Sequence, residues 1–345
     1  MSNRALVGRF HQWRKSGAPL VLATVIQTEG STYSKAGRQI LIRADGDYIG
    51  LVSGGCLEGD LAEHARNVID TGTPVVVTYD MRTGADDLWG MGLGCNGMLK
   101  ILLQRLSAAD NWQPFTDLAA AMSAEQRSIA ALVIAGTLAN FPIGTHFVCM
   151  ADGTWLGGKQ PPGNPAVPAA LPAIAVAATQ QDQCELLWWT IYPWPRLLLL
   201  GAGPDTLPLL ECAHTLGWEV TVADHRSHYI AALPAGLADH AHVIVAAELG
   251  RQLSPDRYSA VIVMSHHLET DRQYLQQLAH YQVPYVGLLG PAARKVRLLE
   301  ELGLQNSEFG ARLRGPVGLP IGADTPATIA LAILSEIQSV LHTLR

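Results

Sequence analysis

The chain has 345 residues, a formal net charge of −6 and 48% hydrophobic residues. This length predicts two domains, each with its own core, and the acidic balance without a long basic run argues against nucleic acid as the main partner. The five cysteines are odd in number, which argues against a disulfide framework and favours a reducing cytoplasm. They show no CxxC or zinc-ligand spacing, which argues against a structural zinc.

The first part of the chain alternates short helical and strand patterns. In chain order we expect a helix over 5–17, a strand over 19–27, a hairpin over 37–52, a helix over 57–72 and strands over 73–80 and 97–106. The hairpin is predicted because apolar residues alternate on both sides of Asp45-Gly46, a strong turn signal. These elements indicate an α/β or α+β domain whose turns carry the unusual residues.

Two of those turns place a cysteine among glycines. Cys56 lies in "SGGCLEGD" directly before the predicted helix, whose dipole favours a thiolate, although the nearby acids Glu58 and Asp60 oppose it. Cys95 lies in "GMGLGCNG". The flanking glycines are Gly54, Gly55, Gly94 and Gly97, which would let the backbone approach a bulky ligand. A single cysteine in such a turn is commonly inert, but two cysteines in similar glycine-rich turns favour a functional role for both. The other three cysteines, Cys149, Cys184 and Cys212, lie in apolar patterns and are predicted to pack in the core.

A further turn, "EGSTYSKAGRQ", precedes a predicted strand. Its hydroxyl groups, together with Lys35 and Arg38, suit the anchoring of phosphate or carboxylate oxygens. A solvated loop without a ligand is the alternative interpretation.

The middle of the chain predicts an extension of the first domain and then a linker. We expect a helix over 115–126 and strands over 129–136 and 146–150, which closes an N-terminal domain at 1–155. The stretch 157–172 holds five prolines and three glycines, a composition typical of a loop. Residues 156–195 are therefore predicted to be a linker and connecting segment, followed by a C-terminal domain over 196–345.

No stretch in the chain reaches the roughly 18 apolar residues of a membrane span, and the N-terminus lacks the apolar core of a secretory signal.

From Arg196 onward, continuous apolar strands alternate with helical patterns. Short buried strands alternating with helices indicate a parallel sheet covered on both faces. The predicted fold class is therefore α/β, with a Rossmann-like parallel-sheet domain after the N-terminal α/β (α+β) domain.

The C-terminal domain carries an incomplete dinucleotide fingerprint. "GAGPDT" supplies Gly201 and Gly203 between a strand and a helix, and Asp224 and Arg226 end the next strand. The third glycine is replaced by Thr206, and Asp205 would repel a pyrophosphate. A nucleotide-bearing ligand and a Rossmann-like sheet that has lost its site remain open alternatives. His266, at the end of a later strand, can bind phosphate or move a proton, or simply cap a loop.

The motifs together resemble the xanthine dehydrogenase accessory factor family, XdhC/CoxI. In the first half the matching stretches are "GSTYSKAG", "GLVSGGCLEGDL" and "WGMGLGCNG". In the second half they are "LLLLGAG", "DHR", "MSHHLETD", "YVGLLGPAARK" and "GLPIGADTPATIALAILSEI". The resemblance covers nearly the whole chain and is specific because both cysteine turns occur beside this C-terminal half.

The resemblance implies an accessory protein rather than an enzyme. Family members bind the molybdenum cofactor, support its sulfuration and deliver it to a xanthine dehydrogenase or aldehyde oxidoreductase-type molybdoenzyme. The implied partners are the apo-hydroxylase and a cysteine desulfurase, and the cofactor is molybdopterin or its cytosine dinucleotide form. Cys56 and Cys95 are the candidates for contact with molybdenum. Oligomerisation is compatible with a site between domains or protomers, but the sequence does not show it.

Two competing hypotheses come from the same residues. An NAD(P)-dependent oxidoreductase would use the fingerprint over 201–226, with His266 or His267 as acid or base. The missing third glycine and Asp205 count against it, so NAD(P) or FAD binding is weakly supported. The other alternative is a scaffold that binds a molybdoenzyme without touching its cofactor.

Overall fold

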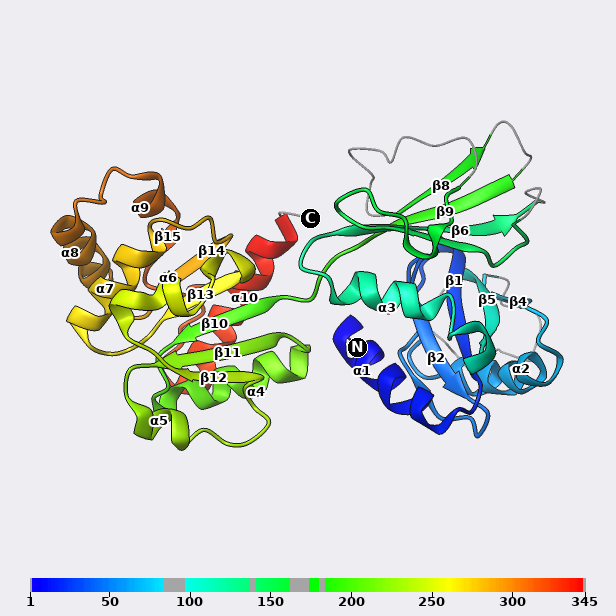
Figure 1. Cartoon of the computed structure of the whole chain (residues 1–345), viewed down its shortest axis with the longest axis horizontal. Helices are drawn as coiled ribbons and strands as arrows, with labels where there is room; N and C mark the ends of the chain where they lie inside the picture. The colour runs from blue at the N-terminus through cyan, green and yellow to red at the C-terminus, as the bar shows by residue number, and fades with distance from the viewer. Residues whose placement is uncertain (1, 83–96, 137–140, 162–173, 180–183, 344–345) are drawn as a thin grey trace. The chain divides into compact units, whose positions relative to one another are not determined.

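The computed structural model describes residues 2–82, 97–136, 141–161, 174–179 and 184–343. The chain divides into two compact units, Met1–Pro193 and Trp194–Arg345 (Figure 1). Within the described residues, no helix is both long and apolar enough to cross a membrane.

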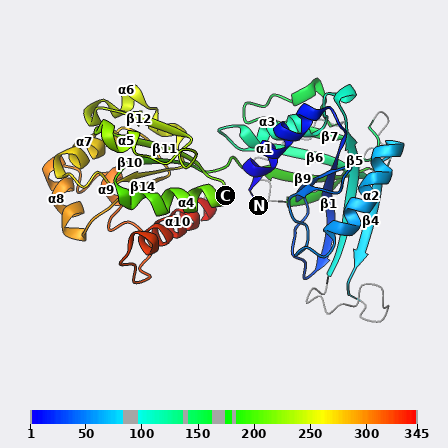
Figure 2. The same cartoon turned by 90° about the horizontal axis from the view of Figure 1, so that it is seen from below.

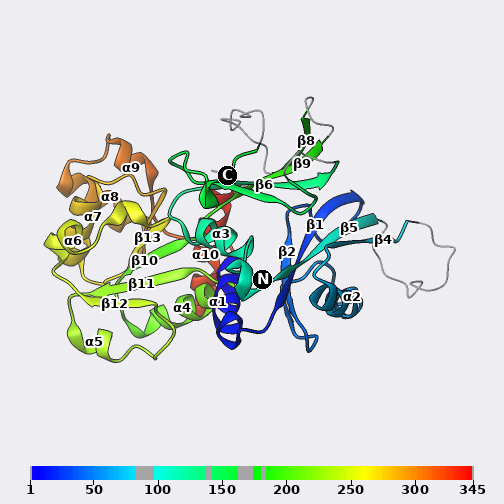
Figure 3. The same cartoon turned by 45° about the vertical axis from the view of Figure 1, so that its right-hand side comes forward.

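The first unit begins with a five-stranded antiparallel sheet in the order β3-β2-β1-β5-β4. Its strands are β1 (Leu20–Gly30), β2 (Gln39–Arg43), β3 (Tyr48–Ile49), β4 (Val75–Asp80) and β5 (Gly97–Leu106). Helix α2 (Glu58–Thr71) packs its apolar face on the sheet, as Figure 3 shows, and buries Leu61, Ala65 and Val68. The helix ends at Gly72, whose φ of +71° forms the C-cap.

A second, four-stranded antiparallel sheet completes the first unit, in the order β7-β6-β9-β8. Its strands are β6 (Ser128–Ala135), β7 (His146–Cys149), β8 (Ile174–Thr179) and β9 (Cys184–Ile191). Helix α1 (Asn3–Trp13) contacts α3 (Phe115–Ser123) through Phe10 and Phe115, whose ring centroids lie 4.8 Å apart.

The interpretation of residues 156–195 as a linker and connecting segment is wrong for β8 and β9. Strand β9 pairs with β6 over most of its length, from Glu185 opposite Ala135 to Ile191 opposite Ser128. Its residues from Leu186 to Trp189 are buried. The apolar run after the proline-rich stretch is therefore a core strand, since burial of its side chains and pairing of its backbone outweigh the loop-like composition that precedes it.

The second unit is a six-stranded parallel sheet in the order β12-β11-β10-β13-β14-β15. The strands are β10 (Arg196–Leu200), β11 (Glu219–Asp224), β12 (His240–Val243), β13 (Ala260–Val263), β14 (Tyr285–Leu288) and β15 (Leu313–Arg314). In chain order this is a 3-2-1-4-5-6 arrangement, the doubly wound order of Rossmann folds. The predicted fold class is confirmed.

Helices cover both faces of the parallel sheet. Figure 2 shows α4 (Leu207–Leu216) and α10 (Pro326–Thr343) side by side on one face. The other face is covered by α6 (Leu249–Gln252), α7 (Leu268–Leu278), α8 (Ala292–Leu302) and α9 (Glu308–Arg312), while α5 (Ser227–Ala231) follows β11. Short 3-10 turns lie at Arg14–Ser16, Ala108–Asp110, Leu156–Gly158, Pro204–Thr206, Ala246–Glu248 and Pro255–Arg257. Because both faces are buried, every β10 residue from Leu197 to Leu200 is fully enclosed.

The four cysteines in the described part of the chain divide into a buried and an exposed pair. Cys149 and Cys184 are buried in strands, as predicted, whereas Cys212 is exposed and the expectation that it packs in the core is wrong. Helix α4 turns Leu209, Leu210 and Ala213 toward the sheet, which leaves Cys212 on its outer side. Cys56 is exposed.

We expect a brief alkylation of the native protein to modify Cys56 and Cys212 at least about tenfold faster than Cys149 and Cys184, because buried thiols react only after local opening. Burial, together with the nearby charge of Asp152, also raises the pKa of the Cys149 thiol, which lowers its thiolate fraction. Peptide mass spectrometry with and without urea measures each site. Equal rates for Cys149 and Cys212 in the native protein would contradict the described burial.

Candidate functional site

Three segments meet at one end of the five-stranded sheet. Gly30, at the end of β1, pairs with Gly97 at the start of β5. The loop over 31–38 touches the loop over 50–57, since Ser34 Oγ donates a hydrogen bond to the Leu51 carbonyl oxygen at 3.2 Å. A Cβ on Gly97 would lie 2.6 Å from the Ser31 carbonyl oxygen, so only glycine permits this approach. The antiparallel topology therefore brings the loops over 31–38 and 50–57 to the end of the sheet where β5 begins at Gly97.

The turn over residues 53–57 is organised around one hydroxyl. Ser53 Oγ accepts hydrogen bonds from the backbone N–H groups of Gly55, Cys56 and Leu57, at 3.2, 3.1 and 3.1 Å. A Cβ on Gly54 or Gly55 would meet no atom within 4 Å, so the outer side of the turn is open. The exposed Cys56 thiol is therefore presented on a turn whose backbone donors are satisfied from within.

Glu58 has a different role from the one expected of it. It is fully buried, and its carboxylate accepts hydrogen bonds from the N–H groups of Val52 and Ser53, at 3.0 and 2.9 Å, and from Ser53 Oγ. Burial alone would raise the pKa of Glu58, but these hydrogen bonds from Ser53 and Val52 outweigh it and the pKa is lowered. Glu58 therefore fixes the loop before Cys56, a role that sequence reasoning missed. An acid in the first turn of a helix can reach back to preceding N–H groups, which is the signal that was available.

The two basic candidate residues of the neighbouring loop differ in their exposure to solvent. Lys35 is exposed, whereas Arg38 is half-buried and its Nε donates to the Leu51 carbonyl oxygen at 3.5 Å. Both belong to the loop that contacts the Cys56 turn. Cys95 and Gly94 lie outside the described residues, and Gly97 is placed two positions after Cys95 at the same sheet end.

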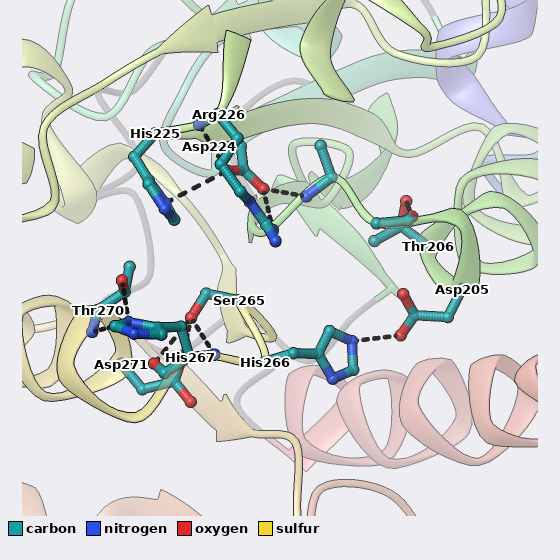
Figure 4. Close-up of polar contacts among 12 residues, drawn as sticks. Asp205, Thr206, Asp224, His225, Arg226, Ser265, His266, His267, Thr270 and Asp271 are labelled. Carbon is teal, nitrogen blue, oxygen red and sulfur yellow. Dashed lines mark hydrogen bonds and ion pairs between the residues drawn. The ribbon is translucent and has the colours of Figure 1, made fainter. Parts of the chain in front are cut away.

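A second group of candidate residues lies at the carboxyl ends of β10, β11 and β13, shown in Figure 4. Gly201, with φ of +141°, allows the loop after β10 to pass the end of β13. A Cβ there would lie 2.3 Å from the Met264 carbonyl oxygen. A Cβ on Gly203 would lie 2.7 Å from Asp205 Oδ1. Gly201 is thus required for the close approach of the loops after β10 and β13, at the point where the strand order reverses, whereas a Cβ on Gly203 would meet only the movable Asp205 carboxylate.

Asp224 does not offer a free oxygen to a ribose, contrary to the role predicted for it. The residue is fully buried, and its carboxylate accepts from the Ala202 N–H at 2.8 Å and from Arg226 through the backbone N–H, Nε and Nη2. Burial would raise the pKa of Asp224, but the hydrogen bonds from Arg226 and Ala202 lower it overall. Asp224 therefore ties the glycine loop to the end of β11.

Asp205, the acid expected to repel a pyrophosphate, is paired with a histidine. Asp205 Oδ2 lies 2.8 Å from His266 Nε2, as Figure 4 shows, and the pair is partly exposed. His266 has φ of +61°, a left-handed conformation that few residues other than glycine adopt. His267 is instead the N-cap of α7: its Nδ1 accepts from the Thr270 N–H at 3.3 Å and lies 2.9 Å from Thr270 Oγ1. Of the two histidines, His266 is thus the one placed beside the glycine loop.

The candidate residues therefore form two groups, one in each unit. In the described part of the chain, no cluster of three or more histidine, cysteine or acidic side chains is arranged to hold a metal ion. The first group offers an exposed thiol on an open glycine turn, and two basic residues on the loop that contacts Leu51 before this turn. The second offers a Rossmann switch point with the Asp205–His266 pair and Arg226.

The architecture is that of an α/β protein in which a thiol-bearing antiparallel unit precedes a Rossmann-type unit. Residues 13–80 match the XdhC and CoxI family, and residues 197–337 match the XdhC Rossmann domain. A Bacillus subtilis protein named as a probable xanthine dehydrogenase component is 30% identical over 318 residues, which is 92% of each chain. The chain belongs to the XdhC and CoxI family.

Two other similarities extend over most of the chain. The Escherichia coli protein named "Molybdenum cofactor insertion chaperone PaoD" is 26% identical over 329 residues, covering 94% of this chain and 84% of that protein. A crystal structure from Bacillus halodurans, described as a xanthine dehydrogenase, superposes with a TM-score of 0.78 at 27% identity. It covers 100% of this chain and 97% of that one, so the two-unit architecture is shared.

Proposed function

We propose that the protein is a chaperone for the molybdenum cofactor, which it binds, protects and inserts into an apo molybdenum hydroxylase. The observation that carries the proposal is the exposed Cys56 on an open glycine turn, in a chain that matches an insertion chaperone over 94% of its length. The client is proposed to be of the xanthine dehydrogenase or aldehyde oxidoreductase type. The printed names of two similar proteins support the first type, and the second rests on the family resemblance.

The residues of the first unit suit such a guest chemically. A thiolate is a soft ligand suited to a transition metal, and Gly54 and Gly55 leave space beside Cys56 for a large ring system. Lys35 and Arg38 on the adjoining loop would donate hydrogen bonds to a phosphate. Cys95 and Gly94 belong to the proposal through the sequence alone, and Gly97 through its position at the same sheet end.

The second unit is proposed to hold the nucleotide end of the cytosine dinucleotide form of the cofactor. Gly201, Gly203 and His266 surround the switch point where Rossmann folds bind a pyrophosphate. Sulfuration of the cofactor, with a cysteine desulfurase as partner, a cytoplasmic location and a homo-oligomeric state are the remaining parts of the proposal. Sulfuration and the desulfurase partner rest on the family resemblance. The cytoplasmic location rests on the low and odd number of cysteines, and the homo-oligomer on a site shared between protomers.

An NAD(P)-dependent oxidoreductase is less well supported. Asp224 has its carboxylate engaged by Ala202 and Arg226, and His267 caps α7. These contacts remove two of the groups on which that alternative depends. It also leaves the glycine–cysteine turns without a role.

The test is pterin retention by the full chain purified from a host that makes molybdopterin. After oxidation, the wild type is expected to release a fluorescent pterin. At least one of the single variants Cys56→Ser and Cys95→Ser is expected to retain about tenfold less pterin, because the loss of one ligand contact of about 1.4 kcal/mol has that effect. Release is quantified by fluorescence against protein concentration.

Cys212→Ser is the matched control, since Cys212 is an exposed thiol in the other unit and should leave retention unchanged. A Cys56→Ser/Cys95→Ser double variant that retains pterin like the wild type would remove the thiols from the proposal. A wild type without pterin would overturn the proposal itself.

A further inference from the structure

The parallel sheet of the second unit has an open edge at β12. In the part of the chain that the structure describes, β12 pairs only with β11, and all its residues are exposed (Figure 1). Val243 and Val245 are 54% and 56% exposed, although valine normally packs in a core. The strand carries no lysine, arginine, acid or proline, the residues with which proteins commonly block an open edge. The edge is therefore suited to pairing with another strand.

Two histidines lie on one face of this edge strand. His240 and His242 are two residues apart in β12, so their side chains point to the same side of the sheet, and their ring centroids lie 6.4 Å apart. Two imidazoles that share a zinc ion have ring centroids about 5 Å apart, given a Zn–N distance of about 2 Å and tetrahedral angles. Because both side chains are exposed, a small rotation about their torsions brings the rings to that distance. One strand thus offers two imidazole ligands to a divalent ion.

One copy of the chain supplies only half of a zinc site. Zinc in a closed site takes four tetrahedral ligands, and within the described residues no third histidine, cysteine or acid joins the pair. A second copy supplies the other half if the two β12 strands pair antiparallel about a twofold axis through Ala241. That register places His240 opposite the partner's His242, and His242 opposite the partner's His240, so four imidazoles gather on one face.

The backbone of β12 is compatible with this register. The Ile244 N–H, just after the strand, donates to the Asp224 carbonyl oxygen of β11 at 3.0 Å. Because backbone groups alternate along a strand, the even-numbered residues direct their N–H and C=O groups to β11, and Ala241 and Val243 direct theirs outward. Ala241 can therefore exchange two hydrogen bonds with the partner's Ala241 at the axis. The histidine pairs on either side are then non-hydrogen-bonded pairs, in which Cα atoms lie about 4.5 Å apart and side chains are closer.

We propose that β12 is a contact surface for a second copy of this chain, bridged by a zinc ion on His240 and His242 of both copies. The inference gives a surface to the homo-oligomeric state proposed above, and it rests on β12 alone, apart from the cofactor-binding role. A strand of 4 residues buries far less area than the roughly 1,600 Å² of a stable interface. The pairing therefore depends on the ion, whose binding energy is available only when both copies supply their ligands.

The test measures the mass of the full chain by sedimentation velocity, in EDTA and then with ZnCl2 added. Zinc is expected to double the mass found in EDTA, with one ion bound for every two chains. An unchanged mass, or one ion bound per chain without doubling, would overturn the inference. Pterin retention, measured on the same preparations, reports on the proposed chaperone function independently, so failure of one result is distinguishable from failure of the other.

His242→Asn removes two of the four ligands, because the change occurs in both copies. It is expected to abolish the doubling and to weaken zinc binding at least about a hundredfold, since the loss of even a supporting group costs about 10- to 100-fold. His214→Asn is the control, because His214 is an exposed histidine of α4 and should leave the doubling intact.

Ala241→Pro separates strand pairing from chelation by the histidines alone. It keeps both histidines and removes only the N–H group at the proposed axis, which points away from β11, so the β10–β11–β12 ladder should persist. This variant is expected to lose the zinc-dependent doubling. Doubling of either His242→Asn or Ala241→Pro at the zinc concentration that suffices for the wild type would refute the proposed interface.

Discussion

Replacing Glu58 with glutamine is expected to destabilise the first unit by about 2–4 kcal/mol, since a buried group with several hydrogen bonds would lose part of its acceptor set. The carboxylate accepts from two backbone N–H groups and from Ser53 Oγ. A glutamine side chain has one oxygen, and its NH2 group would face donors. The turn over 53–57 should open together with the start of α2. Hydrogen exchange of peptides over 50–62 in the full chain measures the change.

Glu63→Gln is the control for this substitution. Glu63 belongs to the same helix, but its side chain is 73% exposed and pairs with Arg66 at the surface. An exposed ion pair contributes little, so exchange should be unchanged. If Glu58→Gln behaves like Glu63→Gln, the buried carboxylate does not hold the turn.

The same contacts predict a pH dependence. The pKa of Glu58 is lower in the folded protein than its ordinary value. Its stabilising contribution is therefore present above the unfolded pKa of about 4.3 and is lost as the pH falls through the folded pKa. Over this acidic window the wild type should lose stability more steeply than Glu58→Gln, in which the group no longer titrates. Parallel curves would contradict the assignment.

Gly201→Ala is expected to destabilise the second unit by about 3 kcal/mol or more, because overlap with backbone and an unfavourable φ act together. The added Cβ would lie 2.3 Å from the Met264 carbonyl oxygen, so β13 and the glycine loop would have to separate. The change should also move Asp205 away from His266. Hydrogen exchange over β10 and β13 in the full chain reports the local free energy of opening.

Gly303→Ala separates the two causes of that effect. Gly303 has φ of +66° at the end of α8, yet a Cβ there would meet no atom within 4 Å. It should cost only the conformational penalty, about 1 kcal/mol. If the two substitutions have equal effects, the close approach to Met264 is not what requires glycine at position 201.

Regular local patterns predicted much of the fold. The apolar runs after Arg196 predicted a parallel sheet covered on both faces, and the observed strand order is that of a Rossmann fold. The helix before Gly72 and the hairpin around Asp45-Gly46 were also readable, since helical spacing and turn residues act over a few positions. Strand β9 was misassigned because a proline-rich composition next to it suggested a linker, and only its pairing with β6 shows otherwise.

The family, the Rossmann-like half and the turns that carry unusual residues could all be recognised in the amino-acid sequence, because they depend on residue type and short-range spacing. Only the folded chain reveals that Cys212 is exposed, that Glu58 is buried beneath the Cys56 turn and that Asp224 is occupied by Arg226 and Ala202. Those outcomes depend on which groups from distant segments reach one another. A buried carboxylate takes whatever donors the fold brings within hydrogen-bonding distance, and residue spacing along the chain does not specify them.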